Sequence, residues 1–188
     1  GTVTAGLVLI VLGAASKSAL YPFHHWLPGA MVAPTPVSAY LHSATMVKAG
    51  VYLIARLAPV FAPLIGYWRP LVVSVGAATM ILGGWRALSQ DDSKLLLAMG
   101  TVSELGLITL LVGYGDARLT LAGTAMIFAH AIFKAALFMV VGVVDRQVGS
   151  RRLANIVGWG RALPVTWWVA IIAAASMVGL PPLVGFVA

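Results

Sequence analysis

Long apolar runs separated by short polar stretches set the strongest limit on how this chain can fold. Six such runs cover approximately residues 1–15, 37–58, 70–85, 95–115, 119–144 and 164–187. Each is close to the roughly 20 residues that an α-helix needs to cross the ~30 Å hydrocarbon core of a bilayer. The strands of a membrane barrel are about half as long. We therefore expect an all-α membrane protein with about six transmembrane helices.

The composition agrees with a membrane protein. The chain is 61% hydrophobic and 9% charged, with a mean hydropathy of +0.99, which leaves too little polar surface to cover a soluble globule. The chain contains no cysteine, which excludes disulfides and cysteine-ligated metals. The net charge of +7 comes from basic residues scattered singly at the ends of apolar runs. This pattern is typical of loop charges that set the topology of a chain in the lipid bilayer, and it argues against a nucleic-acid partner.

The basic residues of the loops predict the orientation of the chain. Successive loops alternate between two sides, with six basic residues on one side and three on the other. The first side has Arg86, Lys94, Arg146, Arg151, Arg152 and Arg161, and the second has Arg56, Arg69 and Arg118. By the positive-inside rule, the loops near residues 86–94 and 145–161 are cytoplasmic, in a cell (inner) membrane. Because both ends are apolar, we expect residues 1–188 to be one transmembrane domain of a longer protein.

Two of the six runs are interrupted where a membrane-spanning helix is expected. The residues at the breaks are Ser16, Ser18 and Pro22 after the first run, and Gly179, Pro181 and Pro182 in the sixth. Proline removes a helix hydrogen bond and frees backbone groups at membrane depth. Paired interrupted helices are typical of transporters built from inverted repeats, which bind ions at the breaks. For the sixth run a plain proline kink remains an alternative, whereas Lys17 at the first break favours a functional one.

The second run carries ionisable side chains at depth. A charge at the bilayer centre costs roughly 2.5–3.5 kcal/mol even on the insertion scale. His42 lies about one and a half turns inside this run, and Lys48 follows six residues later on the same expected helix. A lone membrane histidine is often a hydrogen-bonded packing residue, but the nearby lysine is too deep to reach the headgroups easily. We expect both side chains to point into the bundle.

The fourth run has a carboxylate near its middle. Asp91 and Asp92 come before Lys94 and are typical of the start of a helix, where they complement the helix dipole. Glu104 lies ten residues after Lys94, which puts it at about mid-span for a rise of ~1.5 Å per residue. A carboxylate at that depth is either protonated or paired with a lysine, and the sequence leaves both possibilities open.

The fifth run contains a histidine and a lysine on one helix face. His130 and Lys134 are spaced i, i+4, so their side chains are neighbours. A buried histidine beside a snorkelling lysine is the structural alternative, but about ten further apolar residues follow Lys134. Since imidazole titrates near neutral pH, His130 can exchange protons under physiological conditions. We expect the two residues to form one step of a proton relay.

Other chemistry has little support in the sequence. The chain has no glycine-rich nucleotide loop and no serine-triad pattern. His24 and His25 are adjacent, so they do not face one another on a helix and make a weak metal pair. We therefore expect no cofactor and no metal site, and a transporter subunit in place of an enzyme.

Four motifs, in this order, resemble the antiporter-like membrane subunits shared by respiratory complex I and the Mrp multisubunit Na⁺/H⁺ antiporters. They are KSALYPFHHWLPGAMVAPTPVSAYLHSATMVKAGVYLIARL, SQDDSKLLLAMGTVSELGLI, HAIFKAALFMVVGVVD and GLPPLVGF. Together they cover almost the whole chain. Within the superfamily, Tyr40, Ser43, Lys48 and the segment 135–145 are more similar to the A-type subunits of the Mrp branch than to complex I subunits.

The resemblance implies a bundle of inverted repeats, in which residues 1–58 end the first repeat and residues 64–188 form most of the second. It implies that Lys17 is the lysine of the first broken helix and that His42 is its partner. It also implies that Lys94 starts the next repeat. Glu104 stands where relatives usually have an amide, and it adds a titratable group. The implied partners are H⁺, Na⁺ and the other membrane subunits of the assembly.

Three functions follow from these patterns. The first is a cation/proton antiporter subunit, with a pathway of Lys17, His42, Lys48, Lys94, Glu104, His130 and Lys134. The second is a proton-pumping subunit of a complex I-type NADH-quinone oxidoreductase, with redox partners on other chains. The third is a scaffold whose lysines merely pair with their neighbours.

Overall fold

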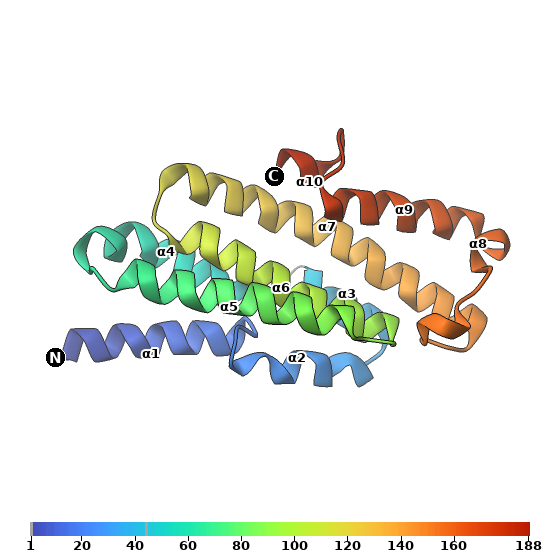
Figure 1. The fold of residues 1–188 in the computed structure, drawn as a ribbon, viewed down its shortest axis with the longest axis horizontal. Coiled ribbons are helices and arrows are strands. Elements are labelled where there is room, and N and C mark those ends of the chain that lie inside the picture. Colours follow the sequence, from blue (N-terminus) through green and yellow to red (C-terminus); the bar gives the residue numbers. More distant parts are fainter. Residues whose placement is uncertain (1, 44) are drawn as a thin grey trace.

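The computed structural model describes residues 2–43 and 45–188, and in these ranges the regular structure is helical apart from an isolated bridge between Asp92 and Arg152. The long helices are α1 (Thr2–Lys17), α4 (Lys48–Leu64), α5 (Trp68–Leu88), α6 (Ser93–Gly113), α7 (Ala117–Val148) and α9 (Pro164–Val178). The shorter ones are η1 (Phe23–His25), α2 (Trp26–Gly29), η2 (Ala30–Val32), α3 (Thr35–Ser43), η3 (Leu153–Asn155), α8 (Trp159–Ala162) and α10 (Val184–Val187). Figure 1 shows the long helices lying lengthwise in an elongated bundle.

Within the described residues, four stretches, one of them made of α3 and α4 together, are long and apolar enough to cross a bilayer. They are Thr35–Leu64, Trp68–Leu88, Ser93–Gly113 and Ala117–Val148. The apolar helices α1 and α9 are shorter, and each is followed by a break in the helix. Each therefore forms one half of an interrupted crossing. This confirms the expected all-α membrane bundle of about six crossings, with the first and last discontinuous.

The first break is held in place by the neighbouring helices. After α1 ends at Lys17, residues 18–22 are not helical, and the chain continues as η1, α2 and η2 over residues 23–32, which we call the second half-helix. The buried hydroxyl of Ser18 accepts a hydrogen bond from the Val51 amide of α4 (3.0 Å), and the Tyr21 amide donates to Thr79 of α5 (2.9 Å). The break is thus tolerated at depth because other helices satisfy its polar groups.

The last break lies between α9 and α10. Gly179 adopts a left-handed conformation with φ of 79°, which ends α9 without the strain that a side chain would add. The amide of Gly185 then donates to the hydroxyl of Ser176 (3.2 Å). This bond holds α10 against the last turn of α9.

A third interruption splits the second crossing, and the sequence did not predict it. Residues 45–47 are not helical, so α3 ends at Ser43 and α4 begins at Lys48. The prediction that His42 and Lys48 share one continuous helix is therefore wrong. The hydroxyls of Ser43 and Thr45 donate to carbonyl groups of the preceding turn (2.6 and 3.4 Å). Such side-chain bonds accompany the interruption, but Thr101 and Thr109 make the same kind of bond inside the unbroken helix α6.

Helix α6 lies at the centre of the bundle, packed against α4, α5 and α7. Its crossing with α5 is close because glycines face backbone. A Cβ atom on Gly106 would lie 2.5 Å from the Met80 nitrogen, and one on Gly83 would lie 2.6 Å from the Ser103 nitrogen. Small residues of this kind let membrane helices approach closely.

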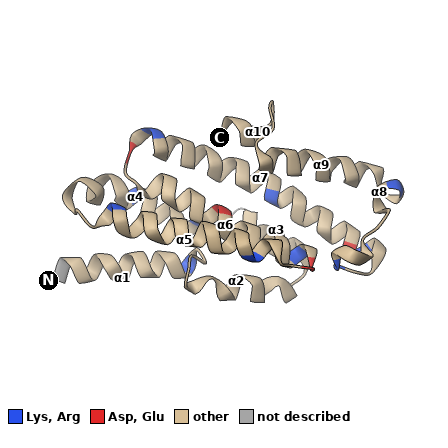
Figure 2. Ribbon diagram, in the orientation of Figure 1, with Lys and Arg blue, Asp and Glu red and all other residues tan. Residues whose placement is uncertain are grey.

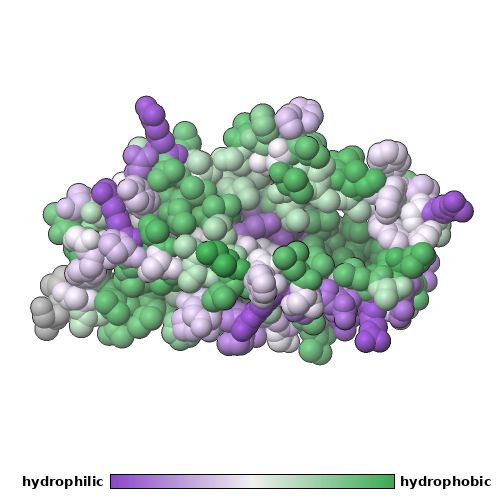
Figure 3. All heavy atoms as spheres, viewed as in Figure 1, coloured by the Kyte–Doolittle hydropathy of each residue, from purple (hydrophilic) through white to green (hydrophobic). Residues whose placement is uncertain are grey.

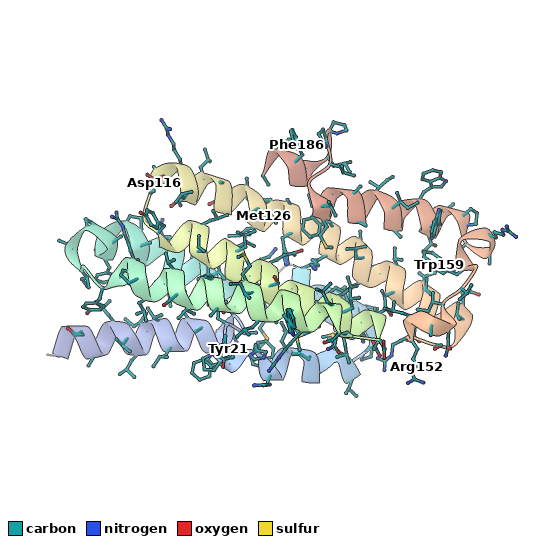
Figure 4. All side chains as sticks on the ribbon, viewed as in Figure 1. Tyr21, Asp116, Met126, Arg152, Trp159 and Phe186 are labelled. Carbon is teal, nitrogen blue, oxygen red and sulfur yellow. The ribbon has the colours of Figure 1, made fainter. Side chains whose placement is uncertain are left out.

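Many charged residues lie at the two ends of the bundle. Between the ends, Figure 2 shows an acidic position on α6, a basic position on α7 and a basic position at the end of α1. Apolar side chains cover much of the face seen in Figure 3. Asp116 and Arg152, labelled in Figure 4, mark the opposite ends. The acidic position on α6 and the basic position on α7 define the candidate site.

Candidate functional site

The centre of the bundle holds one carboxylate between two bases. Glu104 of α6 has its Oε2 atom 3.1 Å from Nε2 of His130 and its Oε1 atom 3.5 Å from Nζ of Lys134. His130 and Lys134 are fully buried, and the Glu104 side chain is 16% exposed. The i, i+4 spacing on α7 places both bases on the face that meets α6. Of the two arrangements that the sequence left open for Glu104, the geometry is that of pairing with a lysine.

Gly100 lets the Lys134 amine approach α6 closely. A Cβ atom on Gly100 would lie 3.2 Å from Nζ of Lys134, so the amine rests against the backbone of α6. Gly100 comes one turn before Glu104 on the same helix. Sequence reasoning missed this residue, although a glycine four residues before a mid-membrane glutamate was a signal available in the sequence.

Lys48 approaches the same part of α7 from α4. Its Nζ atom donates to the main-chain carbonyl of Ile127 (2.9 Å), one turn before His130, and the residue is 8% exposed. The carbonyl dipole offsets part of the cost of burying the ammonium group. Sequence reasoning could not find Ile127, because a main-chain carbonyl has no signature in the sequence.

His42 is on α3 and contacts α7 one turn after Lys134, at Phe138. Its fully buried ring stacks on Phe138, with ring centroids 4.6 Å apart and planes inclined by 30°. Neither ring nitrogen has a hydrogen-bond partner within the described part of the chain. Because Lys134 lies one turn before Phe138 on α7, a proton on His42 and a proton on Lys134 repel one another.

Lys94 is buried at the start of α6, outside this cluster. Ten residues separate it from Glu104, which corresponds to ~15 Å along the helix. Its ammonium group donates to the main-chain carbonyls of Met31 (3.0 Å) and Ala33. Asp92 caps α6 by accepting from the Lys94 and Leu95 amides (2.8 and 3.2 Å), as the sequence predicted.

The remaining predicted residues lie away from the centre. Lys17 is exposed at the end of α1 and forms no ion pair within the residues that the structure describes. Its predicted partnership with His42 has no contact in support. Of the helix-break residues, Ser18 is buried, Gly179 is half-buried, and Ser16, Pro22, Pro181 and Pro182 are exposed. The structure thus brings together Lys48, Glu104, His130 and Lys134, with His42 close by.

The whole chain, residues 1–188, matches the family described as NADH:quinone oxidoreductase/Mrp antiporter, TM. Over 194 aligned residues it is 48% identical to the A-type subunit of the Na⁺/H⁺ antiporter of Alkalihalophilus pseudofirmus, covering 96% of this chain and 24% of that protein. Over 180 residues it is 49% identical to the A/B-type subunit of a probable K⁺/H⁺ antiporter of Rhizobium meliloti, covering 96% of this chain and 18% of that protein.

The fold is also similar to that of a solved structure. A chain of the Mrp complex from Dietzia sp. DQ12-45-1b matches with a TM-score of 0.87 and 47% sequence identity, over 96% of this chain and 20% of that one. The chain thus spans between 18% and 24% of the length of these three relatives. The similarity extends over nearly all of this chain.

Proposed function

This chain belongs to the NADH:quinone oxidoreductase/Mrp antiporter transmembrane family, and on that basis we propose that it is part of the proton-translocating subunit of a multisubunit monovalent cation/proton antiporter. The family match and the long apolar helices show that the chain is a multi-pass membrane protein. The names of its relatives, A-type subunits of Na⁺ or K⁺ antiporters, support this assignment. The observation that carries the proposal is the contact of Glu104 with both His130 and Lys134 halfway along buried helices.

The cluster can pass protons because its groups change charge in concert. When a protonated His130 gives its proton to Glu104 across 3.1 Å, the carboxylate loses its charge. Lys134 then loses its counter-ion, which favours transfer of its own proton to the neutral ring of His42, one turn further along the line. Unit charges a few Å apart at low effective dielectric interact by several kcal/mol, so each transfer drives the next.

The same reasoning extends to both sides of the cluster. Lys48 lies beside the turn of α7 that precedes His130, and His42 lies beside the turn that follows Lys134. We propose that protons move along this line and that Lys17, at the first broken helix, couples it to a cation site formed with the rest of the subunit. Broken helices provide main-chain carbonyl ends for such sites.

The assembly follows from the same assignment. We propose that the other membrane subunits of the antiporter complex surround this chain in the cell membrane. Residues 1–58 then end one repeat and residues 64–188 form most of the next, although α4 itself continues to Leu64. The loops near residues 86–94 and 145–161 face the cytoplasm, since they carry more basic residues than the opposite loops.

A redox-driven proton pump is the second candidate, because the family also includes NADH:quinone oxidoreductase subunits. The cluster would serve either function, and the driving partner distinguishes them. Expression of the full complex in an antiporter-deficient host decides between them. Growth in sodium at alkaline pH supports the antiporter, whereas NADH-quinone activity of the purified assembly supports the pump.

The role of the cluster is tested by Lys134→Ala in the full subunit. We expect cation-dependent proton movement in reconstituted vesicles to fall at least tenfold, because no lysine is then left to release a proton when Glu104 is protonated. The matched control is Ile132→Ala, two residues away on the same helix, where the side chain is 61% exposed. We expect the control to transport at close to the wild-type rate. A wild-type rate in fully assembled Lys134→Ala complexes would refute the proposal.

A further inference from the structure

The second half-helix ends in carbonyl groups that are bound by another part of the chain. The last carbonyls of a helix have no partner within it, and they carry a partial negative charge. Here the stretch 23–32 ends at Val32, and Met31 and Ala33 both accept hydrogen bonds from the ammonium group of Lys94. Lys94 is 2% exposed, so this contact is inside the protein.

Arg151 reaches the same carbonyl from the loop after α7. Its Nη1 atom donates to the Met31 carbonyl (3.5 Å), and its Nε atom lies 3.4 Å from Oδ2 of Asp92. Two main-chain bonds fasten this loop to the start of α6, from Ser93 to Arg151 (2.9 Å) and from Leu153 to Asp91 (2.8 Å). The end of the half-helix is therefore bound by two cations from one connected unit.

The other end of the half-helix is also attached to the later helices. His24 is buried and contacts the guanidinium group of Arg86 on α5. The Tyr21 amide, just before the half-helix, is bound by Thr79 of the same helix. The half-helix is thus fastened at both ends to α5 and α6.

The contacts of Lys94 differ in kind from those of Lys134. Lys134 faces a carboxylate, which can take up a proton, whereas Lys94 donates to main-chain carbonyls, which cannot. The nearby carboxylate of Asp92 accepts from the Lys94 and Leu95 amides and pairs with Arg151. Among the described residues, Lys94 therefore has a fixed ligand for its charge and no proton acceptor in contact with its amine.

We propose that Lys94 and Arg151 form a clasp on the carbonyl end of the second half-helix, and that Lys94 is a positioning residue that carries no proton during transport. The clasp acts on the cluster through α3. Ala33 lies two residues before α3, which carries His42 to its place against Phe138. Losing the clasp frees the carbonyl end of the half-helix and the start of α3, so His42 is held less firmly against Phe138, one turn from Lys134. This inference rests on the proposed function, since it concerns the efficiency of the same relay.

The clasp is tested by comparing Lys94→Arg with Lys94→Met in the full complex in vesicles. An arginine keeps a permanent charge and several donors but does not release its proton. It can therefore replace a lysine that holds the half-helix, but it cannot replace a lysine that carries a proton. We expect Lys94→Arg to keep at least half of the wild-type rate of cation-dependent proton movement over the working pH range. We expect Lys94→Met to lower it about tenfold. The matched control is Lys134→Arg, which should abolish transport.

The outcomes separate the clasp from the relay. If Lys94→Arg is as inactive as Lys94→Met in assembled complexes, or if Lys94→Met has the wild-type rate, the clasp is wrong. If Lys134→Arg transports normally, the proposed function fails, while the Lys94 pair still decides the clasp. If the Lys94→Arg complex does not assemble, the Arg151 variants test the clasp. We expect Arg151→Gln to slow transport about threefold and Arg151→Lys to restore most of it, and a wild-type rate for Arg151→Gln would overturn the proposal.

Discussion

At the scale of single residues, the bundle centre is short of negative charge. Glu104 is the only glutamate in the chain, and it faces His130 and Lys134 while Lys48 lies nearby on α4. A buried ion pair stabilises little by itself, but removing one partner leaves the other charge uncompensated. Glu104 therefore has a structural effect that can be measured separately from transport.

We predict that Glu104→Gln lowers the free energy of unfolding by roughly 3–5 kcal/mol, because the Lys134 charge then stays buried without a counter-ion. The double change Glu104→Gln with Lys134→Met should recover much of this loss, since it removes both charges. Unfolding of the purified subunit in detergent measures both variants. Equal stability of the single and double variants would show that the two side chains are not paired.

At the scale of helices, the close contact of α5 with α6 and the breaks in other helices have different structural requirements. Between α5 and α6 the glycines bring backbones together, so that α6 can sit at the centre with Glu104 facing α7. At the breaks, side chains such as Ser18 and Thr79 satisfy the freed backbone groups. Both depend on the polar and small residues that an apolar helix can tolerate at a protein contact.

Two neighbouring glycines of α5 give a test of this packing. A Cβ atom on Gly83 would meet the backbone of Ser103 at 2.6 Å, whereas one on Gly84 meets only the Ser103 hydroxyl at 3.4 Å. We predict that Gly83→Ala destabilises the subunit by about 1–3 kcal/mol, the usual cost of overpacking, and that Gly84→Ala changes stability little. Thermal unfolding in detergent compares the two. Similar losses for both would contradict the α5–α6 contact.

At the scale of the whole molecule, the loops gather at two ends. The loop before α6 bonds to the loop after α7 at one end, through Asp91 and Leu153, and Asp116 lies at the other. The basic residues favour the first end, which we propose to be cytoplasmic.

The orientation is tested with single cysteines in a cysteine-free full subunit. Arg152→Cys and Arg118→Cys both replace exposed side chains, one at each end of the bundle. We predict that a membrane-impermeant thiol reagent added to intact cells labels Arg118→Cys and leaves Arg152→Cys unlabelled until the membrane is opened. The reverse pattern would show that the proposed topology is inverted. Labelling of both residues in intact cells would show that the two loops do not lie on opposite sides of the membrane.

The sequence by itself determined the features that depend on a residue and its close neighbours. Apolar run length gave the crossings, prolines marked the breaks after α1 and α9, and Asp92 identified the start of α6. The i, i+4 spacing put His130 and Lys134 on one face, because helical geometry is fixed locally. These are properties of a helix before it packs against anything.

Only the tertiary structure decided which groups meet. The pairing of Glu104 with both bases, the bond from Lys48 to Ile127 and the binding of Met31 by Lys94 all join helices that are distant in the chain. The interruption at residues 45–47 also had no proline to announce it. Main-chain carbonyls look the same in every residue, and the facing of one helix toward another depends on the packing of the whole bundle. The sequence therefore identified the ionisable groups, and the packing of the bundle determined their partners.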